Sequence, residues 1–494
     1  MTSELRTRIA PSPTGDPHIG TAYIALFNYC LTKKHGGRFI LRIEDTDRVR
    51  STRASESKII ESLKWLGFDW DEGPDIGGEC GPYRQSERLQ IYHDHIKVLL
   101  DKGAAFHCFC SQERMEEVRK GQLSRGENPG YDGHCLQLSP EEVARKLDNG
   151  EEHVIRLRVP NAGSCMIHDL FRGGVEIDWS QVDMQVLMKT DGYPTYHFAS
   201  VVDDHLMRIT HVLRGEEWIT STPKHLHIYS GFGWEPPKYA HLPLLRNPDG
   251  TKLSKRRNPT SIEYYRRLGI VPEALVNNLG RMAWSMPDEK EKFELSEMIE
   301  AFDLSRVSMG GPRFDIEKLE WLNGTWLRDL SQSQFAEAVT SWAINKSYLN
   351  KVLPLVHGRV QKLSEMERLA GHFFKGLLDL KKEDLQFGKI TSEEVQKLLL
   401  WCGWEFEGLT EWTAESIESA IRTVGMKLDV KIRQVTGVLF VVVTGNKVST
   451  PLFATIEVTG KDLVLARMRQ AVNTIGAIGK KKMKSMQSEY QAIK

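Results

Sequence analysis

Hydrophobic and polar positions divide the chain into a first part of alternating strands and helices and a second part that is mostly helical. Short apolar runs at residues 7–10 and 38–43 alternate with longer stretches of helical spacing at 22–34 and 55–66. Short apolar runs bounded by turns predict strands, and longer runs of helical period predict helices. Because strands and helices alternate, we expect a parallel sheet with helices on its faces.

The segment 84–193 interrupts this alternation. It opens with a predicted helix at 87–102 and carries strand-like runs at 153–159 and 175–179. We therefore expect a domain inserted between two halves of the sheet. The second half should contain strands at 194–202, 209–213 and 239–245 around a helix at 222–229.

Helical spacing dominates beyond residue 261. Pro272 stands in the first turn of one predicted helix, and residues 319–327 belong to another. The continuously apolar run 438–443 is compatible with either a strand or a buried helix, since periodicity does not separate the two. The fold class is therefore α/β, followed by a mostly helical region.

Composition indicates an ordinary globular protein of two to four domains. The chain has 494 residues, 40% of them hydrophobic and 27% charged, and contains seven cysteines. No apolar run approaches the ~20 residues that a transmembrane helix needs, so we expect no membrane association. The odd, scattered cysteines fit a reducing compartment, and the first strand leaves no room for a signal peptide. We therefore expect a cytoplasmic protein.

Charge is balanced overall but not locally. The net charge is zero, whereas residues 461–494 hold eight Lys or Arg against two Asp or Glu. Such a tail is either a solvated basic surface or a surface that contacts phosphates.

The stretch 8–21 is typical of an anion-binding turn. It leads from a strand through a turn rich in Pro, Ser and Gly into an apolar helix. Gly15 and Gly20 allow close backbone approach, and a helix start presents free N–H groups to phosphate. His18 lies where its side chain can reach an anion.

A second candidate lies far along the chain, in the loop Lys252-Leu-Ser-Lys-Arg256 after an Asn-Pro-Asp-Gly turn. Taken alone, two lysines in a loop indicate only a solvated loop. Together with the helix start at His18, however, Lys252 and Lys255 would surround an anionic ligand with cations and N–H donors.

Together the Pro-His-Ile-Gly turn at 17–20 and the Lys-Leu-Ser-Lys loop at 252–255 resemble the two signature motifs of class I aminoacyl-tRNA synthetases. The glutamyl branch is indicated by the stretches Arg-Ile-Ala-Pro-Ser-Pro-Thr-Gly at 8–15, Leu-Arg-Ile-Glu-Asp-Thr-Asp-Arg at 41–48 and Arg-Gly-Glu-Glu-Trp at 214–218. The resemblance is dense over the first two-thirds of the chain and chiefly architectural thereafter.

The resemblance implies five segments. A Rossmann-type parallel-sheet catalytic domain would occupy 1–83 and 194–245, interrupted at 84–193 by an inserted α+β connective domain that binds the acceptor end. A lysine-loop and stem-contact domain would follow at 246–330. An all-helical, bacterial-type anticodon-binding domain would occupy 331–494.

Glutamate as a substrate needs its own complement of side chains. Its side-chain carboxylate calls for arginines with bidentate geometry, for which Arg8 and Arg214 are the candidates. Its α-amino group calls for an acid, for which Glu44 is the candidate. Either type of residue, met alone, would indicate only a surface ion pair.

The resemblance assigns roles residue by residue. The catalytic residues would be His18, Lys252 and Lys255. Glutamate would contact Arg8, Ala10, Ser12, Glu44, Tyr196, Ser200 and Arg214. ATP would contact His18, Gly20, Glu217, Trp218, Leu244, Leu245, Lys252, Ser254 and Lys255. Ser200 departs from the family, which usually carries asparagine at that position, and a water could fill the gap.

A metal site is left open. Cys108, Cys110 and Cys135 lie where some glutamyl enzymes bind structural zinc, which favours four N or S ligands. The family's fourth ligand is a histidine, but this chain has Gln137 there. His134 or His107 could substitute, and the alternative is a lost site with three reduced cysteines.

The implied function is that of a glutamate–tRNA ligase, which activates L-glutamate with Mg²⁺-bound ATP and transfers it to the 2′-hydroxyl of the terminal adenosine of tRNA-Glu. Activation would require bound tRNA, and we expect a monomer. Two alternatives stay open: a non-discriminating form that also charges tRNA-Gln, and an inactive RNA-binding paralogue. A truncated relative that glutamylates a tRNA base is disfavoured because residues 331–494 are present.

Overall fold

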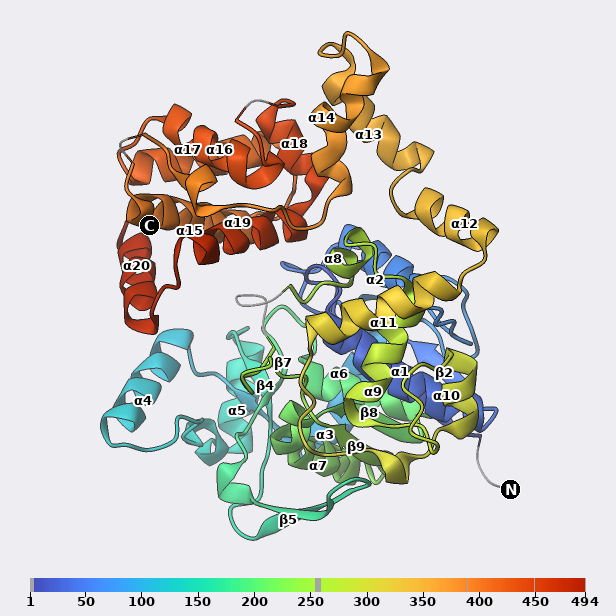
Figure 1. Ribbon diagram of the computed structural model, residues 1–494. Helices are drawn as coiled ribbons and strands as arrows, with labels where there is room; N and C mark the ends of the chain where they lie inside the picture. The colour runs from blue at the N-terminus through green and yellow to red at the C-terminus, as the bar shows by residue number, and fades with distance from the viewer. Residues whose placement is uncertain (1–3, 254–258, 389, 448, 494) are drawn as a thin grey trace. The chain divides into compact units, whose positions relative to one another are not determined.

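A computed structural model describes residues 4–253, 259–388, 390–447 and 449–493. The chain forms two compact units (Figure 1). The first comprises 1–253 and 272–322, and the second comprises 254–271 and 323–494. Helix α11 (Ile316–Asp329) crosses the boundary between them.

Parallel strands form the centre of the first unit. Strand β1 (Arg6–Ile9) pairs with β2 (Arg38–Leu41), and β8 (His211–Gly215) pairs with β9 (Lys238–Leu242), both in parallel. Strand β1 runs beside β8, where the amide of Thr210 donates to the carbonyl of Arg6 over 3.0 Å. Helix α1 (Ile19–Lys34) packs against β1, β2 and β8 with most of its side chains buried, which explains its nearly all-round apolar sequence. The predicted parallel sheet is confirmed.

Segment 84–193 forms an antiparallel sheet and a hairpin. Strands β3 (Ala105–Cys108), β4 (Val154–Leu157) and β7 (Val186–Met188) form a sheet in the order β3-β4-β7. Strands β5 (Ser164–Asp169) and β6 (Gly173–Asp178) form a hairpin whose β5 pairs with β9. This hairpin therefore extends the sheet to the order β6-β5-β9-β8.

The predicted strand at 194–202 is wrong. Residues 196–206 form helix α6 (Tyr196–Leu206), which buries Phe198, Val201 and Val202 on one side and two aspartates at its end. The apolar and β-branched residues here favour a strand only weakly, and packing of the run against α7 (Thr222–Phe232) and α3 (Leu89–Asp101) overrides that preference.

Further helices complete the described part of the first unit. They are α2 (Arg53–Trp65), α4 (Gln112–Ser124), α5 (Pro140–Asp148), α9 (Pro272–Ala283) and α10 (Leu295–Ala301).

The second unit is helical within its described residues. One buried core of this unit gathers Trp401, Cys402 and Phe406 with the apolar run 438–443, which lies in helix α17. Of the two alternatives for this run, a strand or a buried helix, the structure shows the buried helix. The helices are α8 (Ile262–Arg267), α12 (Gln332–Trp342), α13 (Lys346–His357), α14 (Met366–Ala370), α15 (Ser392–Gly408), α16 (Ala414–Lys427), α17 (Ile432–Thr444), α18 (Leu452–Thr459), α19 (Lys461–Ile475) and α20 (Lys480–Ala492).

The cysteines and the helices of the fold both bear on the expectations from composition. All seven cysteines are free thiols in the structure. Among the described helices, none has both the length and the apolar character needed to span a membrane.

Candidate active site

A cavity of about 510 Å³ opens at the carboxyl ends of β1, β8 and β9. Ligands bind at this edge of parallel sheets because the loops that follow the strands converge there. Of the predicted site residues, the cavity brings together Arg8, Ala10, Ser12, His18, Gly20, Glu44, Tyr196, Arg214, Glu217, Trp218, Leu244, Leu245 and Lys252. Ser254 and Lys255 lie outside the described residues.

His18 caps the first turn of α1. Its Nδ1 accepts a hydrogen bond from the amide of Gly20 over 2.8 Å. A neutral imidazole that accepts at Nδ1 carries its proton on Nε2, so the ring lining the cavity is a donor at that atom. A Cβ at Gly20 would lie 2.9 Å from His18 Nδ1, so a side chain there would displace the ring.

Arg8 is hydrogen-bonded to Asp204, a carboxylate that was not among the predicted site residues. Its Nε lies 3.1 Å from Asp204 Oδ1, and Arg42 Nη1 lies 2.6 Å from the same oxygen. All three side chains are buried. One aspartate at the end of α6 therefore pairs with both arginines, so Arg8 already has a carboxylate partner before any ligand binds.

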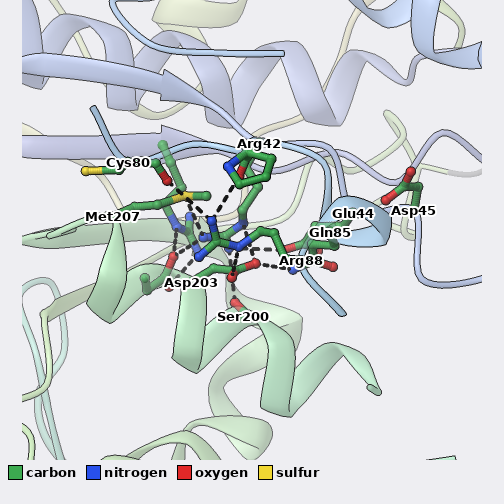
Figure 2. A network of polar contacts seen from close by, with 12 residues as sticks. Arg42, Glu44, Asp45, Cys80, Gln85, Arg88, Ser200, Asp203 and Met207 are labelled. Atoms are coloured by element: carbon green, nitrogen blue, oxygen red, sulfur yellow. Dashed lines mark hydrogen bonds and ion pairs between the residues drawn. The ribbon is translucent and has the colours of Figure 1, made fainter. Parts of the chain in front are cut away.

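Glu44 lines the cavity and is paired with Arg42. Its Oε1 lies 3.0 Å from Arg42 Nη2 (Figure 2). Burial raises the pKa of Glu44 to about 7, although Arg42 and Arg8 act to lower it. The carboxyl group therefore titrates near neutral pH.

Beneath Glu44, the buried polar contacts continue to Asp203 and Ser200 (Figure 2). Asp203 accepts from Arg88 Nε over 2.7 Å and from the hydroxyl of Tyr92 over 2.8 Å. Ser200 is buried, accepts from Arg42 Nη2 over 3.3 Å, and is not among the described residues that line the cavity. Ser200 therefore contacts Arg42 and does not line the cavity as described.

Arg214, at the end of β8, is held by neutral groups. Its Nε lies 3.0 Å from His241 Nε2, its Nη1 lies 3.1 Å from His225 Nδ1, and its Nη2 donates to the hydroxyl of Thr222 over 2.8 Å. Its guanidinium also lies over the ring of Tyr239. The side chain is buried and lines the cavity, where an anion is its natural ligand.

Three of the residues that the resemblance assigns to ATP, Glu217, Trp218 and Leu244, line another part of the cavity. The rings of Trp218 and Tyr196 lie 4.5 Å apart between centroids. The amide of Leu244 donates to Glu216 Oε1 over 3.1 Å, which fixes the loop after β9. Glu217 crowds Gly215, where a Cβ would lie 2.0 Å from Glu217 Oε2.

Three thiols form a separate cluster on the antiparallel sheet. The Sγ atoms of Cys108, Cys110 and Cys135 lie within 4.8 Å of one another, and those of Cys110 and Cys135 are 3.5 Å apart. Four thiolates at Zn–S distances of ~2.3 Å stand roughly 3.8 Å apart, so the spacing suits zinc. The cluster could therefore hold this metal.

The fourth position of the cluster differs from the candidates that the sequence suggested. His134 and Gln137 are exposed. Neither His134 nor His107 belongs to the group formed by the three cysteines. The hydroxyl of Tyr131 lies 3.8 Å from Cys110 Sγ and accepts from the Cys135 amide over 2.7 Å, and Arg114 Nη1 donates to Cys110 Sγ over 3.4 Å.

Two family models match the chain in succession. The model described as tRNA synthetases class I (E and Q), catalytic domain, covers residues 4–321. The model described as anticodon binding domain covers residues 334–472. Together they account for the mixed α/β part and for most of the helical part.

Close relatives match over nearly the full length. The glutamate–tRNA ligases of Pseudomonas putida F1 and Pseudomonas entomophila are each 54% identical over 489 residues, which is 99% of this chain and 99% of theirs. A crystal structure of a glutamate tRNA ligase from Elizabethkingia meningosepticum in complex with its amino acid is 33% identical and has a TM-score of 0.65. That match covers 96% of this chain and all of that one. The chain therefore belongs to the glutamate–tRNA ligases of the class I aminoacyl-tRNA synthetases.

Proposed function

We propose that this ligase joins L-glutamate to tRNA-Glu in two steps within the cavity described above. In the first step, a glutamate α-carboxylate oxygen attacks the α-phosphorus of ATP, and pyrophosphate leaves. In the second step, the 2′-hydroxyl of the terminal adenosine attacks the carbonyl of glutamyl-adenylate, and AMP leaves. The Mg²⁺ that we expect would enter with the phosphates of ATP.

The observation that carries the proposal is the buried, cavity-lining Arg214 held by neutral partners. A buried guanidinium of this kind favours a carboxylate ligand, and its fork allows bidentate contact. We assign the glutamate side chain to Arg214, with Arg8, Ala10, Ser12 and Tyr196 around it. Glu44, when ionised, would bind the α-ammonium group.

The phosphates of ATP would lie at the start of α1. There the amides of the first turn and the Nε2–H of His18 are donors for the charge that develops on the α-phosphate. Lys252 lines the same cavity and would add positive charge, and we assign Lys255 and Ser254 to the same loop. Gly20, Glu217, Trp218, Leu244 and Leu245 would hold the nucleoside.

We propose five domains with the boundaries predicted above: catalytic halves at 1–83 and 194–245, the acceptor-binding insert at 84–193, the stem-contact domain at 246–330 and the anticodon-binding domain at 331–494. The support for the last is the helical unit that begins at 323 and its matching family model. The basic residues of α20 are candidates for phosphate contacts.

We also propose that the cysteine cluster binds zinc through Cys108, Cys110, Cys135 and the oxygen of Tyr131. The ion would tie α4 and the loop before α5 to strand β3 and so stabilise the insert. Metal analysis of the purified protein should find one zinc per chain. Tyr131→Phe should weaken zinc retention against a chelator more than His134→Ala or Gln137→Ala. Equal retention in all three variants would exclude the tyrosine as a ligand.

The proposed function is tested by glutamate-dependent exchange of pyrophosphate into ATP, with and without tRNA-Glu. We expect exchange only when tRNA is present, followed by charging of tRNA-Glu. Charging of purified tRNA-Gln at a similar rate would identify a non-discriminating enzyme. Absence of exchange in well-folded protein under both conditions would contradict the proposal and favour an RNA-binding paralogue.

A further inference from the structure

The two imidazoles that contact Arg214 act as hydrogen-bond acceptors. An arginine has only donors, so the ring nitrogens facing it, His241 Nε2 and His225 Nδ1, must be unprotonated. Each ring must then carry its proton on the nitrogen that faces away from Arg214.

A carboxylate fixes the outer nitrogen of His241. Asp169 Oδ2 lies 2.6 Å from His241 Nδ1, so this nitrogen is the donor. The same oxygen accepts from the His241 amide over 3.0 Å. Asp169 therefore sets the ring's tautomer and orientation, and the lone pair of Nε2 is directed at Arg214.

A third histidine fixes the outer nitrogen of His225. Its Nε2 lies 3.0 Å from His197 Nδ1. Because His225 Nδ1 accepts from Arg214, the proton shared with His197 belongs to His225 Nε2. Burial, reinforced by the nearby cation of Arg214, holds the pKa of His225 well below its ordinary value, and the pKa of His197 is lowered to about 4. Both rings are therefore neutral at physiological pH.

This arrangement differs from that of Arg8. Arg8 is ion-paired with Asp204, whereas no carboxylate among the described residues lies within ion-pair distance of Arg214. Imidazoles hold the guanidinium in place without cancelling its charge. A carboxylate in place of either imidazole would hold it equally well but would supply the negative charge that the ligand should bring.

We propose that His225 and His241 are positioning residues that keep Arg214 oriented and uncompensated, so that the pocket selects a carboxylate side chain over an amide. The inference rests on the proposed assignment of the glutamate side chain to Arg214. It extends that assignment to a set of neutral acceptors backed by Asp169 and His197.

Asn and Asp have the same shape, so replacing His225 by each of them separates the position of the hydrogen-bond acceptor from its charge. In His225→Asn, the amide oxygen takes the place of Nδ1 and remains a neutral acceptor. In His225→Asp, the acceptor has the same shape but carries a negative charge. We expect KM for glutamate to rise about tenfold or more in the Asp variant and no more than about threefold in the Asn variant, with KM for ATP unchanged.

Selectivity for glutamate over glutamine is a measurement that a merely structural role of His225 would leave unchanged. Pyrophosphate exchange, measured with tRNA present, should show the ratio of kcat/KM for glutamate over glutamine falling about tenfold in His225→Asp relative to His225→Asn. Equal ratios and equal KM values in the two folded variants would overturn the proposal.

A second comparison covers the case in which the buried aspartate prevents folding. His225→Leu removes the acceptor without adding charge, and KM for glutamate should then exceed that of His225→Asn. His241→Gln, which keeps an acceptor near the Nε2 position, should resemble His225→Asn. If the wild-type protein is active and His225→Leu and His225→Asn have equal KM values for glutamate, only the positioning role of His225 is overturned. A wild-type protein without glutamate-dependent exchange would contradict the proposed function itself.

Discussion

Two fully buried arginines, one in each unit, show two ways to place a cation inside a protein. In the first unit, Arg42 lies among carboxylates, with Asp204 at 2.6 Å and Glu44 at 3.0 Å. In the second unit, Arg467 donates to the backbone carbonyls of His372, Lys375, Gly376 and Val443. No carboxylate among the described residues is paired with Arg467.

The difference appears in the acidity of the two groups. Burial alone lowers the pKa of an arginine, and it lowers that of Arg467 to about 10. At Arg42 the negative charges of Asp204, Glu44 and Asp203 outweigh burial, so its pKa lies above the ordinary value. Ion pairs thus balance charge beside a ligand cavity, whereas backbone dipoles suffice where the arginine only fastens chain segments together.

The largest expected effect comes from breaking the ion-paired region. Asp204→Ala leaves both Arg8 and Arg42 without their closest carboxylate, and removing one partner of a buried pair costs about 3–5 kcal/mol. We expect the unfolding transition of the first unit to lose that amount in urea titrations followed by circular dichroism. A loss under about 1 kcal/mol would mean that Glu44 and Asp203 replace the missing charge.

A smaller effect should follow from breaking the dipole-held region. Arg467→Met leaves four carbonyls without their donor, which we expect to cost about 2–3 kcal/mol in the unfolding transition of the second unit. KM for glutamate, measured well below the transition, should stay at the wild-type value. A raised KM in this variant would show that Arg467 does more than fasten local segments.

Glu44 allows a pH test of the first region. Its folded-state pKa of about 7 lies above its ordinary value, so the neutral form predominates below pH 7 and attraction to the substrate ammonium is lost there. KM for glutamate should therefore fall about tenfold between pH 6 and pH 8, and Glu44→Gln should flatten this profile at a high KM. By the same sign, this carboxyl group's contribution to folding stability decreases as pH rises from about 4.5 to 7.

The smallest effect is expected for an exposed pair, which sharpens the contrast with both buried arginines. Glu418 accepts from Arg422 Nε over 2.9 Å on the surface of α16. Glu418→Gln should change the free energy of unfolding by about 0.5 kcal/mol or less, and 0.5 M salt should abolish the difference. A cost comparable to that of Asp204→Ala would refute the distinction between buried and exposed charges.

The sequence alone predicted those site residues that lie in continuous motifs. The residues of 8–20, Glu44 and 214–218 could be placed because each motif follows a strand, and parallel strands end at one edge of a sheet. The supporting residues could not be placed in this way. Asp204, His225 and His241 are distant in sequence from the arginines that they hold, and each looks like an ordinary helix or strand residue.

The errors in the fold have similar causes. The run 194–202 has strand-like composition, but packing places it in α6, and only tertiary contacts could decide this. Strand β5 left no such local signal. Residues 164–169 alternate between exposed and buried positions in the structure, but the apolar Met166 is exposed and the charged Asp169 is buried, so hydropathy does not show the alternation.

The cap of α1 gives the cavity a built-in spectroscopic reporter. The Gly20 amide bonds to the same imidazole whose far nitrogen is assigned to the phosphates. Any event that protonates Nδ1 or turns the ring removes this acceptor and exposes the amide to solvent exchange. The nitrogen-15 resonance and exchange rate of one glycine, with no added label on the ligand, would thus follow the state of His18 through the reaction cycle.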